Sequence, residues 1–433
     1  MEEANGINHL CNSDGWILPS RFSVTLNNDN SIIQEPANDK KTEEHYRQLL
    51  PKGVKFIHQN LNGITSKFVE IKNLLQFNRD IAVFAITESK LCPERDSDLA
   101  YDIPGYKMVR KDRNSEGGGT LVYIRSEFDI ETLSPPKRKP QLLECTIVKL
   151  KMYKVRPIFI VTFYIPPQIV SVSAIEYIAA TLKEFSRNSE IIIFGDLNLN
   201  LLVSTELTRK LKSLTADFHF KQLIKVPTRV NLHKSGQTYR ISRTLLDPIF
   251  VNIHNMYPQS GAFDYAGSDH KLVYTVRQRT NIKFNGHKII MYRPYKNIDK
   301  EQFNKKLNEI KWDRILTENT NIDLDRIENV ILTYLLPCAP VKTRTVRPGN
   351  QPWFNTRILN EIKERDKVKR EFNKTQDPYQ GLLYKKLKNN VKELCHVAKK
   401  SHFNCELEKA SDSTSIWNVM NNLTNFRLKK DHV

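Results

Sequence analysis

Carboxylate and amide side chains stand directly after several short apolar runs of this 433-residue sequence. Asn60 and Glu88 each follow one such run, and Asp196 and Asn198 follow a third in the sequence GDLN. Asp247 follows a fourth run. Because the strand ends of a layered sheet converge at one edge, we expect these side chains to share a site.

The triplet Ser268-Asp269-His270 precedes another apolar run and adds a histidine to this set. Oxygen donors without cysteine form a hard environment that suits Mg²⁺, and one histidine there can transfer a proton or contact a phosphate. Each piece alone is more typical of a turn, a helix cap or a solvated strand end. Five such pieces in this order are much harder to explain as unrelated turns and strand ends.

The elements that must position these residues are short strands bounded by turn residues, with helical patterns between some of them. Many strands with a few helices predict a layered α/β domain over residues 51–280. The apolar runs predict strands at Val54–His58, Ile81–Ile86, Thr120–Ile124, Leu142–Leu150, Pro157–Tyr164, Glu190–Phe194, Leu245–Val251 and Lys271–Val276, and the periodicity predicts helices at Ser66–Phe77 and Ser173–Arg187.

The two flanks of this domain differ from it in composition. Residues 1–50 are polar and without periodicity, which predicts a disordered leader. Residues 281–433 predict a separate basic helical region, with prolines before its longest helix. Its expected helices are Glu301–Ile310, Ile322–Leu336 and Thr356–Leu407.

Charge indicates a polyanionic partner. The formal net charge is +19, and residues 281–433 carry 30 basic and 18 acidic residues. A basic surplus of this size is typical of proteins that bind nucleic acid, although a basic protein without such a partner remains the alternative. The six cysteines are scattered without a CxxC pair, which predicts neither a zinc site nor a disulfide framework. No secretory signal or membrane span is recognisable, so we expect a soluble intracellular protein with no membrane partner.

The ordered set of motifs resembles the endonuclease/exonuclease/phosphatase superfamily, which includes deoxyribonuclease I and the apurinic/apyrimidinic endonucleases. The likeness is greatest to the endonuclease of non-LTR, LINE-type, jockey-like retrotransposons and covers residues 54–278. It implies a four-layered α/β sandwich like that of deoxyribonuclease I. The motifs are QNLNG (59–63), ITES (86–89), PGYKMVRKDRNSEGGGTLVYIR (104–125), FYIPP (163–167), GDLN (195–198), PTR (227–229), LLD (245–247) and SDH (268–270).

The resemblance implies a Mg²⁺ site, with Mn²⁺ as a possible substitute. Glu88 is implied as the direct ligand, with Asn60 and Asp269 at the same site. Asn60 is also implied in substrate binding, together with Ser268 and, in a looser match, Thr238.

The resemblance also implies catalytic roles. Asp196 would align or deprotonate the attacking water, and Asn198 would donate to the phosphoryl oxygens. Tyr164 would contact the scissile phosphate. His270 would contact the phosphate or move a proton, with Asp247 orienting its ring.

The region 281–433 resembles the linker that precedes the reverse transcriptase of such elements, although no polymerase motif follows it. The implied function is nicking of DNA to leave a 3′ hydroxyl, in the nucleus, with DNA as partner and no specific protein partner. The basic C-terminal region is expected to bind nucleic acid, including element RNA, while packing against the endonuclease remains the alternative. Two further alternatives are a phosphoesterase of the same fold acting on RNA or another phosphoester, and a non-catalytic nucleic-acid-binding remnant.

Overall fold

The computed structural model describes residues 39–278, except for 48, 114–116, 153–154, 186–188 and 237, and it also describes residues 351–424. Between these ranges it describes 288–292, 300–312 and scattered positions from 316 to 346.

The first mixed sheet has six strands in the order β13-β14-β1-β2-β4-β3. Its only parallel pair, β1 with β2, lies at the centre, and α2 (Phe68–Phe77) connects the two strands. Parallel neighbours need such a crossover, which is usually a helix. The strands are β1 (Val54–Asn60), β2 (Ile81–Thr87), β3 (Tyr106–Lys111), β4 (Thr120–Arg125), β13 (Gln259–Phe263) and β14 (Leu272–Arg277).

The second mixed sheet repeats this plan with six strands in the order β5-β6-β7-β8-β12-β9. Its parallel pair is β7 with β8, and α3 (Val172–Phe185) connects them. The strands are β5 (Asp129–Leu133), β6 (Glu144–Met152), β7 (Val155–Tyr164), β8 (Glu190–Asp196), β9 (Lys221–Gln222) and β12 (Ile249–Val251).

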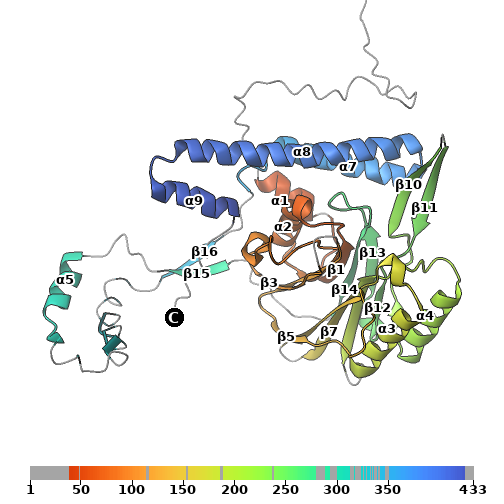
Figure 1. Ribbon diagram of the computed structural model, residues 1–433, viewed down its shortest axis with the longest axis horizontal. Coiled ribbons are helices and arrows are strands. Elements are labelled where there is room, and N and C mark those ends of the chain that lie inside the picture. Colours follow the sequence, from red (N-terminus) through yellow and green to blue (C-terminus); the bar gives the residue numbers. More distant parts are fainter. Residues whose placement is uncertain are drawn as a thin grey trace, which may run out of the picture. The chain divides into compact units, whose positions relative to one another are not determined.

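The two sheets pack face to face, and helices cover their outer faces (Figure 1). Phe56 and Val83 of the first sheet share one buried cluster with Ile160 and Ile192 of the second. A separate cluster joins the first sheet to α2, and a third joins the second sheet to α3 and α4 (Glu206–Asp217). These four layers confirm the predicted α/β sandwich.

Each strand predicted from an apolar run lies within or overlaps a strand of the structure. The strands that sequence reasoning missed are less buried or shorter, since β3, β5 and β13 have intermediate or exposed positions and β9 has two residues. Their sequences therefore lack the continuous apolar run that marks a strand covered on both faces.

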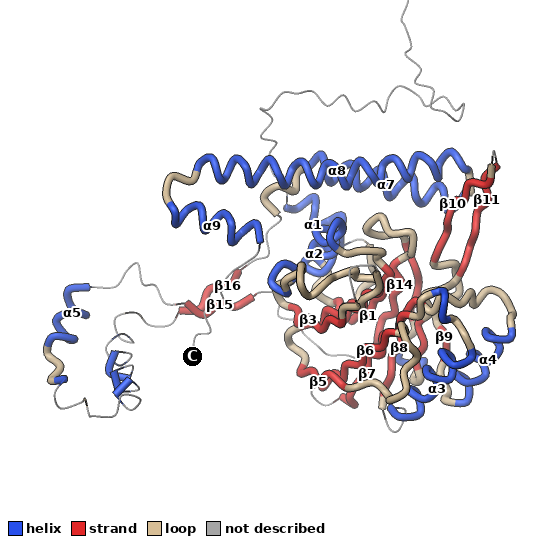
Figure 2. The backbone as a smooth tube through the Cα atoms, viewed as in Figure 1, coloured by secondary structure: helices blue, strands red, loops and turns tan. Residues whose placement is uncertain are grey.

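Two further strand pairs stand outside the sandwich. β10 (Arg229–Ser235) and β11 (Thr238–Thr244) form an antiparallel hairpin that is visible in Figure 2. β15 (Lys288–Tyr292) pairs with β16 (Lys342–Val346), in a region where only helices were expected. Short 3-10 helices occupy Thr65–Lys67, Asp98–Tyr101, Pro167–Ile169 and His254–Met256.

The single long helix expected at residues 356–407 is instead a pair of helices, so that expectation is wrong. α7 (Thr356–Thr375) ends at Gln376, whose φ of 58° is left-handed, and α8 (Pro378–Lys409) begins two residues later. Asp377 caps α8 through the amide of Tyr379, and proline is tolerated at a first helical position but not in an interior. The two helices lie side by side (Figure 1). The C-terminal region also contains α5 (Lys300–Asn308) and α9 (Ser413–Thr424).

The leader expected to be disordered contains a helix, α1 (Asp39–Arg47), so the expectation is wrong for these residues. Its sequence is mostly charged, but Tyr46 is fully buried and stacks with Phe77 of α2. One well-placed aromatic residue thus anchors a helix without an apolar stripe. Residues 1–38 of the predicted leader and residues 279–280 of the predicted domain lie outside the described part of the chain. In the predicted helix Ile322–Leu336, nine positions between 323 and 335 are described, and all of them are helical.

No helix among the described residues has the length and apolar character that crossing a membrane requires.

Candidate active site

The site is built where the parallel strands of the two sheets end. In the first sheet Asn60 pairs with Thr87, which directly precedes Glu88. In the second sheet Tyr164 pairs with Asp196. Because parallel strands end at the same edge, this topology brings residues that are far apart in sequence together.

Asn60 joins the two sheets at this edge. Its side-chain Nδ2 donates to Oε1 of Glu88 at 2.7 Å and to Oδ2 of Asp196 at 2.7 Å. Asn60 and Asp196 are each 1% exposed. The amide therefore holds two carboxylates from different sheets within one small volume.

The backbone is left-handed at three residues that follow the strands ending at this edge. Asn62, Glu88 and Asn198 have φ values of 47°, 49° and 47°. Such geometry is unfavourable for residues other than glycine and clusters at functional sites, where the surrounding structure must hold it. Asn62, Glu88 and Asn198 lie in the loops that follow β1, β2 and β8.

Asp247 and His270 form a buried pair beside Asp196. The ring nitrogen Nδ1 of His270 lies 2.8 Å from Oδ2 and 3.1 Å from Oδ1 of Asp247. Burial disfavours the charged imidazole, but the carboxylates of Asp247 and Asp196 outweigh it and raise the pKa of His270 to about 9. Burial likewise opposes ionisation of Asp247, yet the charge of His270 and its hydrogen bond keep the pKa of that carboxyl below its usual value. The pair is therefore an imidazolium and a carboxylate near pH 7.

Asp196 faces the other ring nitrogen of His270. Its Oδ2 lies 3.9 Å from Nε2, and its Oδ1 accepts from the backbone amide of Asn198 at 3.0 Å. Burial raises the pKa of Asp196 above its usual value, His270 opposes this effect and Asp247 adds to it. A carboxyl with a raised pKa is suited to accept a proton from water.

Ser268 ties the His270 loop to the first sheet. Its hydroxyl donates to the backbone carbonyl of Asn60 at 2.7 Å and accepts from the amide of His270 at 3.2 Å. The side chain of Gln59 donates to the carbonyl of His270 at 2.9 Å. Ser268 thus supports the position of the histidine, and its implied part in substrate binding stays a prediction.

Tyr164 and Asn198 border the same cluster. Burial raises the pKa of Tyr164, and Glu88 and Asp196 add to the rise. The guanidinium carbon of Arg113 lies 5.8 Å from the centre of the Tyr164 ring. The side-chain Nδ2 of Asn198 donates to the carbonyl of Ile165 at 3.0 Å.

Asp269, predicted as a metal-site residue, is paired with Arg229 in this structure. Its Oδ2 accepts from Nη2 of Arg229 at 2.7 Å and from Nε at 3.0 Å. Burial would raise the pKa of Asp269, but His270 and Arg229 lower it to about 2. Its carboxylate therefore stays charged, and its place among metal ligands stays a prediction.

Thr238 is not brought to the cluster. It pairs with Ser235 at the far end of the β10–β11 hairpin, six residues along β11 from Thr244, which pairs with Arg229. At 3.3–3.4 Å per residue this separation is roughly 20 Å. The hydroxyl of Thr238 donates instead to the carbonyl of Ser235 at 2.9 Å.

Thr228 is a residue of this site to which sequence reasoning assigned no role. Its hydroxyl donates to Oδ2 of Asp247 at 2.6 Å and accepts from the amides of Leu246 and Asp247 at 3.0 and 3.2 Å. It is fully buried. Its signal in the sequence was the PTR motif at 227–229, which marked the likeness but gave no role to its threonine.

Glu144 was also missed by sequence reasoning, and it explains the three glycines at 117–119. Its Oε2 accepts from the amide of Gly119 at 2.8 Å, and a Cβ added at Gly118 would lie 2.3 Å from its Oε1. The carbonyls of Gly118 and Gly119 accept from the amides of Lys90 and Ser89, beside Glu88. The glycines thus allow a close approach of Glu144 and of the loop after β2.

The donor set fits a divalent cation on the Glu88 side of the site. Glu88 and Asp196 share one neutral amide, and Nζ of Lys90 lies 3.9 Å from Oε2 of Glu88. Carboxylate oxygens of this kind match the ligand preference of Mg²⁺. Oxygen and nitrogen atoms of Asp196, Asp247 and His270 also lie within 4.8 Å of one another. Glu88, which the resemblance implied as the direct ligand, and Asn60 stay the predicted metal-site residues.

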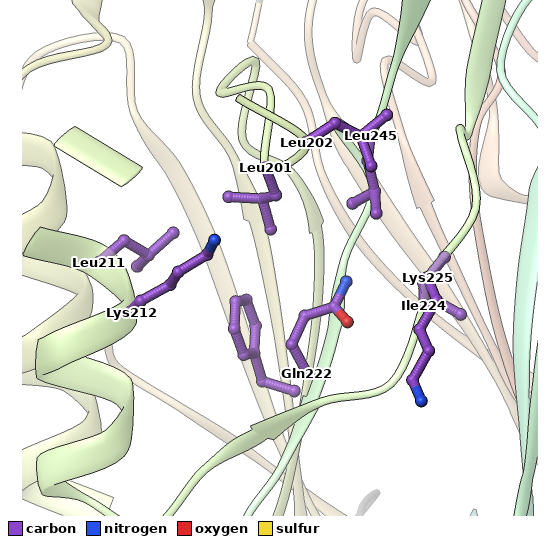
Figure 3. A pocket seen from close by; sticks show the side chains of 9 residues that line it. Leu201, Leu202, Leu211, Lys212, Gln222, Ile224, Lys225 and Leu245 are labelled. Atoms are coloured by element: carbon purple, nitrogen blue, oxygen red, sulfur yellow. The ribbon is translucent and has the colours of Figure 1, made fainter. Parts of the chain in front are cut away.

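A cavity of about 220 Å³ lies away from this chemistry, between α4 and β12 (Figure 3). Leu201, Leu211 and Phe250 contribute to its lining, together with Lys212 and Gln222. None of its nine lining residues is a predicted catalytic residue, and its walls are mainly apolar. It is not the reaction site.

Comparison with known proteins gives matches among solved structures. No family model and no curated protein sequence matches the chain. The structural neighbours are proteins of the endonuclease/exonuclease/phosphatase fold.

One neighbour is the endonuclease domain of TRAS1, a telomere-specific non-LTR retrotransposon, with 15% identity, a TM-score of 0.41 and coverage of 52% of this chain and 99% of the other. An apurinic/apyrimidinic endonuclease from Archaeoglobus fulgidus has 16% identity, a TM-score of 0.39 and coverage of 52% and 100%. The 3′-5′ exonuclease NExo from Neisseria meningitidis has 14% identity, a TM-score of 0.42 and the same coverage. At these low values a function has to be argued from the side chains of this chain.

Proposed function

We propose that this chain is a divalent-metal-dependent DNA endonuclease that hydrolyses one strand and leaves a 3′ hydroxyl. The observation that carries the proposal is the single cluster of Glu88, Asn60, Asp196, Asp247 and His270, in which buried carboxylates lie beside a charged imidazole.

In this mechanism Asp196 accepts a proton from a water molecule as its oxygen attacks phosphorus. The bond between phosphorus and the 3′ oxygen breaks, which gives a 5′ phosphate and, once the leaving oxygen takes a proton from solvent water, a 3′ hydroxyl. His270, held charged by Asp247, contacts the non-bridging oxygens as negative charge accumulates. Glu88 and Asn60 would hold Mg²⁺, which when bound supplies charge neutralisation at the phosphate.

Charge supports nucleic acid as the substrate. The chain carries a net +19, and Lys90, Arg113 and Arg229 lie beside the acidic cluster. A negative site within a positive surround attracts a polyanion while keeping the means to bind a cation. An acidic or neutral surround would be expected for an uncharged substrate.

The test is a plasmid nicking assay with the full chain, with and without Mg²⁺, against an Asp196→Asn variant. We expect open-circular product only with metal and with intact Asp196. A DNA polymerase should extend the nick without prior phosphatase treatment, because the end carries a 3′ hydroxyl. Equal nicking by Asp196→Asn would exclude this mechanism, and cleavage of RNA alone would favour the phosphoesterase alternative.

A further inference from the structure

A buried ion pair joins the C-terminal helices to the α/β sandwich. Arg365 of α7 is 2% exposed, and its Nη1 and Nη2 donate to Oε1 and Oε2 of Glu70 in α2 at 2.8 and 2.9 Å. Nη2 also donates to Asp366 at 2.6 Å. A two-pronged arginine–carboxylate contact fixes both distance and orientation. Loss of either partner would leave a buried charge unpaired. The pair therefore holds α7 against α2 of the sandwich.

The same arginine lies against the loop that carries Ser268 and His270. Gly267 has a φ of 60°, and a Cβ added there would lie 3.2 Å from Nη1 of Arg365. The hydroxyl of Tyr384 in α8 donates to the carbonyl of Ser268 at 3.3 Å. The loop therefore has α7 and α8 as its immediate support.

The opposite side of this loop is held by the sandwich itself. Tyr265 donates to the backbone carbonyl of Glu70 at 2.5 Å, and Gln59 donates to the carbonyls of Tyr265 and His270 at 2.9 Å each. Glu70 thus contacts the loop through its backbone and Arg365 through its carboxylate. Movement of α7 would be passed to the loop through Glu70 as well as through direct contact.

A second contact links the helices to the β10–β11 hairpin. Phe372 of α7 packs with Val230 and Leu232 of β10. A Cβ added at Gly381 of α8 would lie 2.9 Å from Leu232, so glycine permits the close approach. Nζ of Lys385 donates to the carbonyl of Leu232 at 3.3 Å. Figure 1 shows the ends of α7 and α8 beside this hairpin.

The base of that hairpin leads back to the site. Arg229, the first residue of β10, forms an isolated antiparallel bridge with His270 and pairs with the carboxylate of Asp269. The amide of Lys271 donates to the carbonyl of Thr228 at 2.7 Å. The helices therefore reach the histidine by two routes, the 264–269 loop and β10.

We propose that α7 and α8 belong to the catalytic unit and act as a brace for the Ser268–His270 loop, with Arg365 and Tyr384 as positioning residues. The inference rests on the proposed nuclease activity. A nucleic-acid-binding arm would present its arginines to solvent, as α7 does with Arg370. Arg365 instead points its charge into the packing, where it can act only on position.

The test compares two variants of the full chain with matched controls on the same helices. Arg365→Lys keeps the charge but loses the two-pronged contact, and its control is Arg370→Lys, at an exposed position of α7. Tyr384→Phe removes one hydroxyl, and its control is Tyr379→Phe in α8. For each protein we would measure kcat, KM and the salt dependence of DNA nicking, hydrogen exchange of residues 264–270, and the melting temperature.

We expect Arg365→Lys to lower kcat about tenfold or more, since small displacements of reacting groups are costly, with KM and its salt dependence unchanged. Hydrogen exchange in residues 264–270 should accelerate in Arg365→Lys and Tyr384→Phe and not in the controls.

A loss of DNA affinity at constant kcat would overturn the proposal and assign the helices to DNA binding. Unchanged kcat and unchanged hydrogen exchange would also overturn it. If Arg365→Lys does not fold, Tyr384→Phe decides. Inactive wild-type protein would refute the proposed nuclease, while the exchange measurement would still decide whether the helices brace the loop.

Discussion

Nδ1 of His270 lies 2.8 Å from Oδ2 of Asp247, and both side chains are almost fully buried. One ring nitrogen is thereby occupied, and the other faces Asp196 at 3.9 Å. A buried imidazole held in this way has a fixed orientation and keeps its proton, so Asp247 and His270 should behave as one functional unit.

Replacement of either member of this unit should therefore cost nearly as much as replacement of both. We expect Asp247→Ala and His270→Ala each to lower kcat by about 10² or more, as residues that act together do, and the double variant to be much less impaired than the product of the two losses. Steady-state nicking rates of the four proteins check this. His254→Ala, at an exposed position, is the control. Losses that simply multiply would argue against a functional pair.

The pH dependence of nicking should report the same pair. The pKa of His270 is raised from 6.5 to about 9, so the ring is charged below that pH and neutral above it. We expect kcat to fall as pH rises through about 9. In Asp247→Asn the carboxylate that raises this pKa is lost, and the fall should move to lower pH. A fall at the same pH in both proteins would mean that another group titrates.

The same shift links pH to stability. A pKa that is higher in the folded than in the unfolded state contributes stability that is fully present below pH 6.5 and is lost as pH rises through about 9. The raised pKa of Asp196 acts in the same direction at lower pH. We expect the melting temperature to decrease between pH 6.5 and 9, and to decrease less in His270→Ala.

Much of the site could be predicted because its residues follow continuous apolar strands. Asn60, Glu88 and Asp196 stand at the ends of β1, β2 and β8, whose residues are buried throughout. A run of this kind identifies a central strand, and its end identifies the edge where ligands bind.

The residues that escaped prediction lie where sequence spacing carries no such signal. Thr228 precedes the short β10, and its distance from Asp247 depends on how the hairpin returns to the sheet. Thr238 was a looser match to the family, and the length of the hairpin places it away from the cluster. Arg365 is one of many basic residues in a charged helix, and only the packing against Glu70 distinguishes it.

Metal dependence should depend on Glu88. We expect Glu88→Gln, which keeps the shape and removes the charge, to lower nicking at saturating DNA by about 10² or more, since a hard divalent cation needs carboxylate ligands. Raising the Mg²⁺ concentration should recover part of the loss. Glu94→Gln is the control, since Glu94 lies at an exposed position in the same loop region. Full activity of the wild-type chain in EDTA would exclude the metal mechanism.

Truncation should show whether the C-terminal helices support the active site or are dispensable for it. Removal of residues 285–433 leaves Glu70 without Arg365, and it uncovers Val230 and Leu232, which pack against Phe372. We expect a lower melting temperature and little nicking, in contrast to the independent domain that the sequence led us to expect. A chain ending at residue 410 keeps α7 and α8 and is the matched control. If the shorter chain melts and nicks like the longer one, the helices are dispensable.

Thr228 offers the sharpest test of a residue found only in the structure. Its hydroxyl donates to Asp247 and accepts from the amides of Leu246 and Asp247. Thr228→Val is close to it in shape but removes all three contacts. Buried polar groups left without a partner cost about 1–3 kcal/mol, so the melting temperature should fall. Nicking should fall further than stability alone explains, because Asp247 also orients His270.

Thr228→Ser keeps the hydroxyl, so it should keep the wild-type kcat even if it loses some packing. Measurement of kcat at a temperature where all three proteins are folded separates the two effects. If valine keeps the wild-type kcat while serine lowers it, the threonine acts through its methyl group, and the chain of contacts from Thr228 through Asp247 to His270 has no role in catalysis.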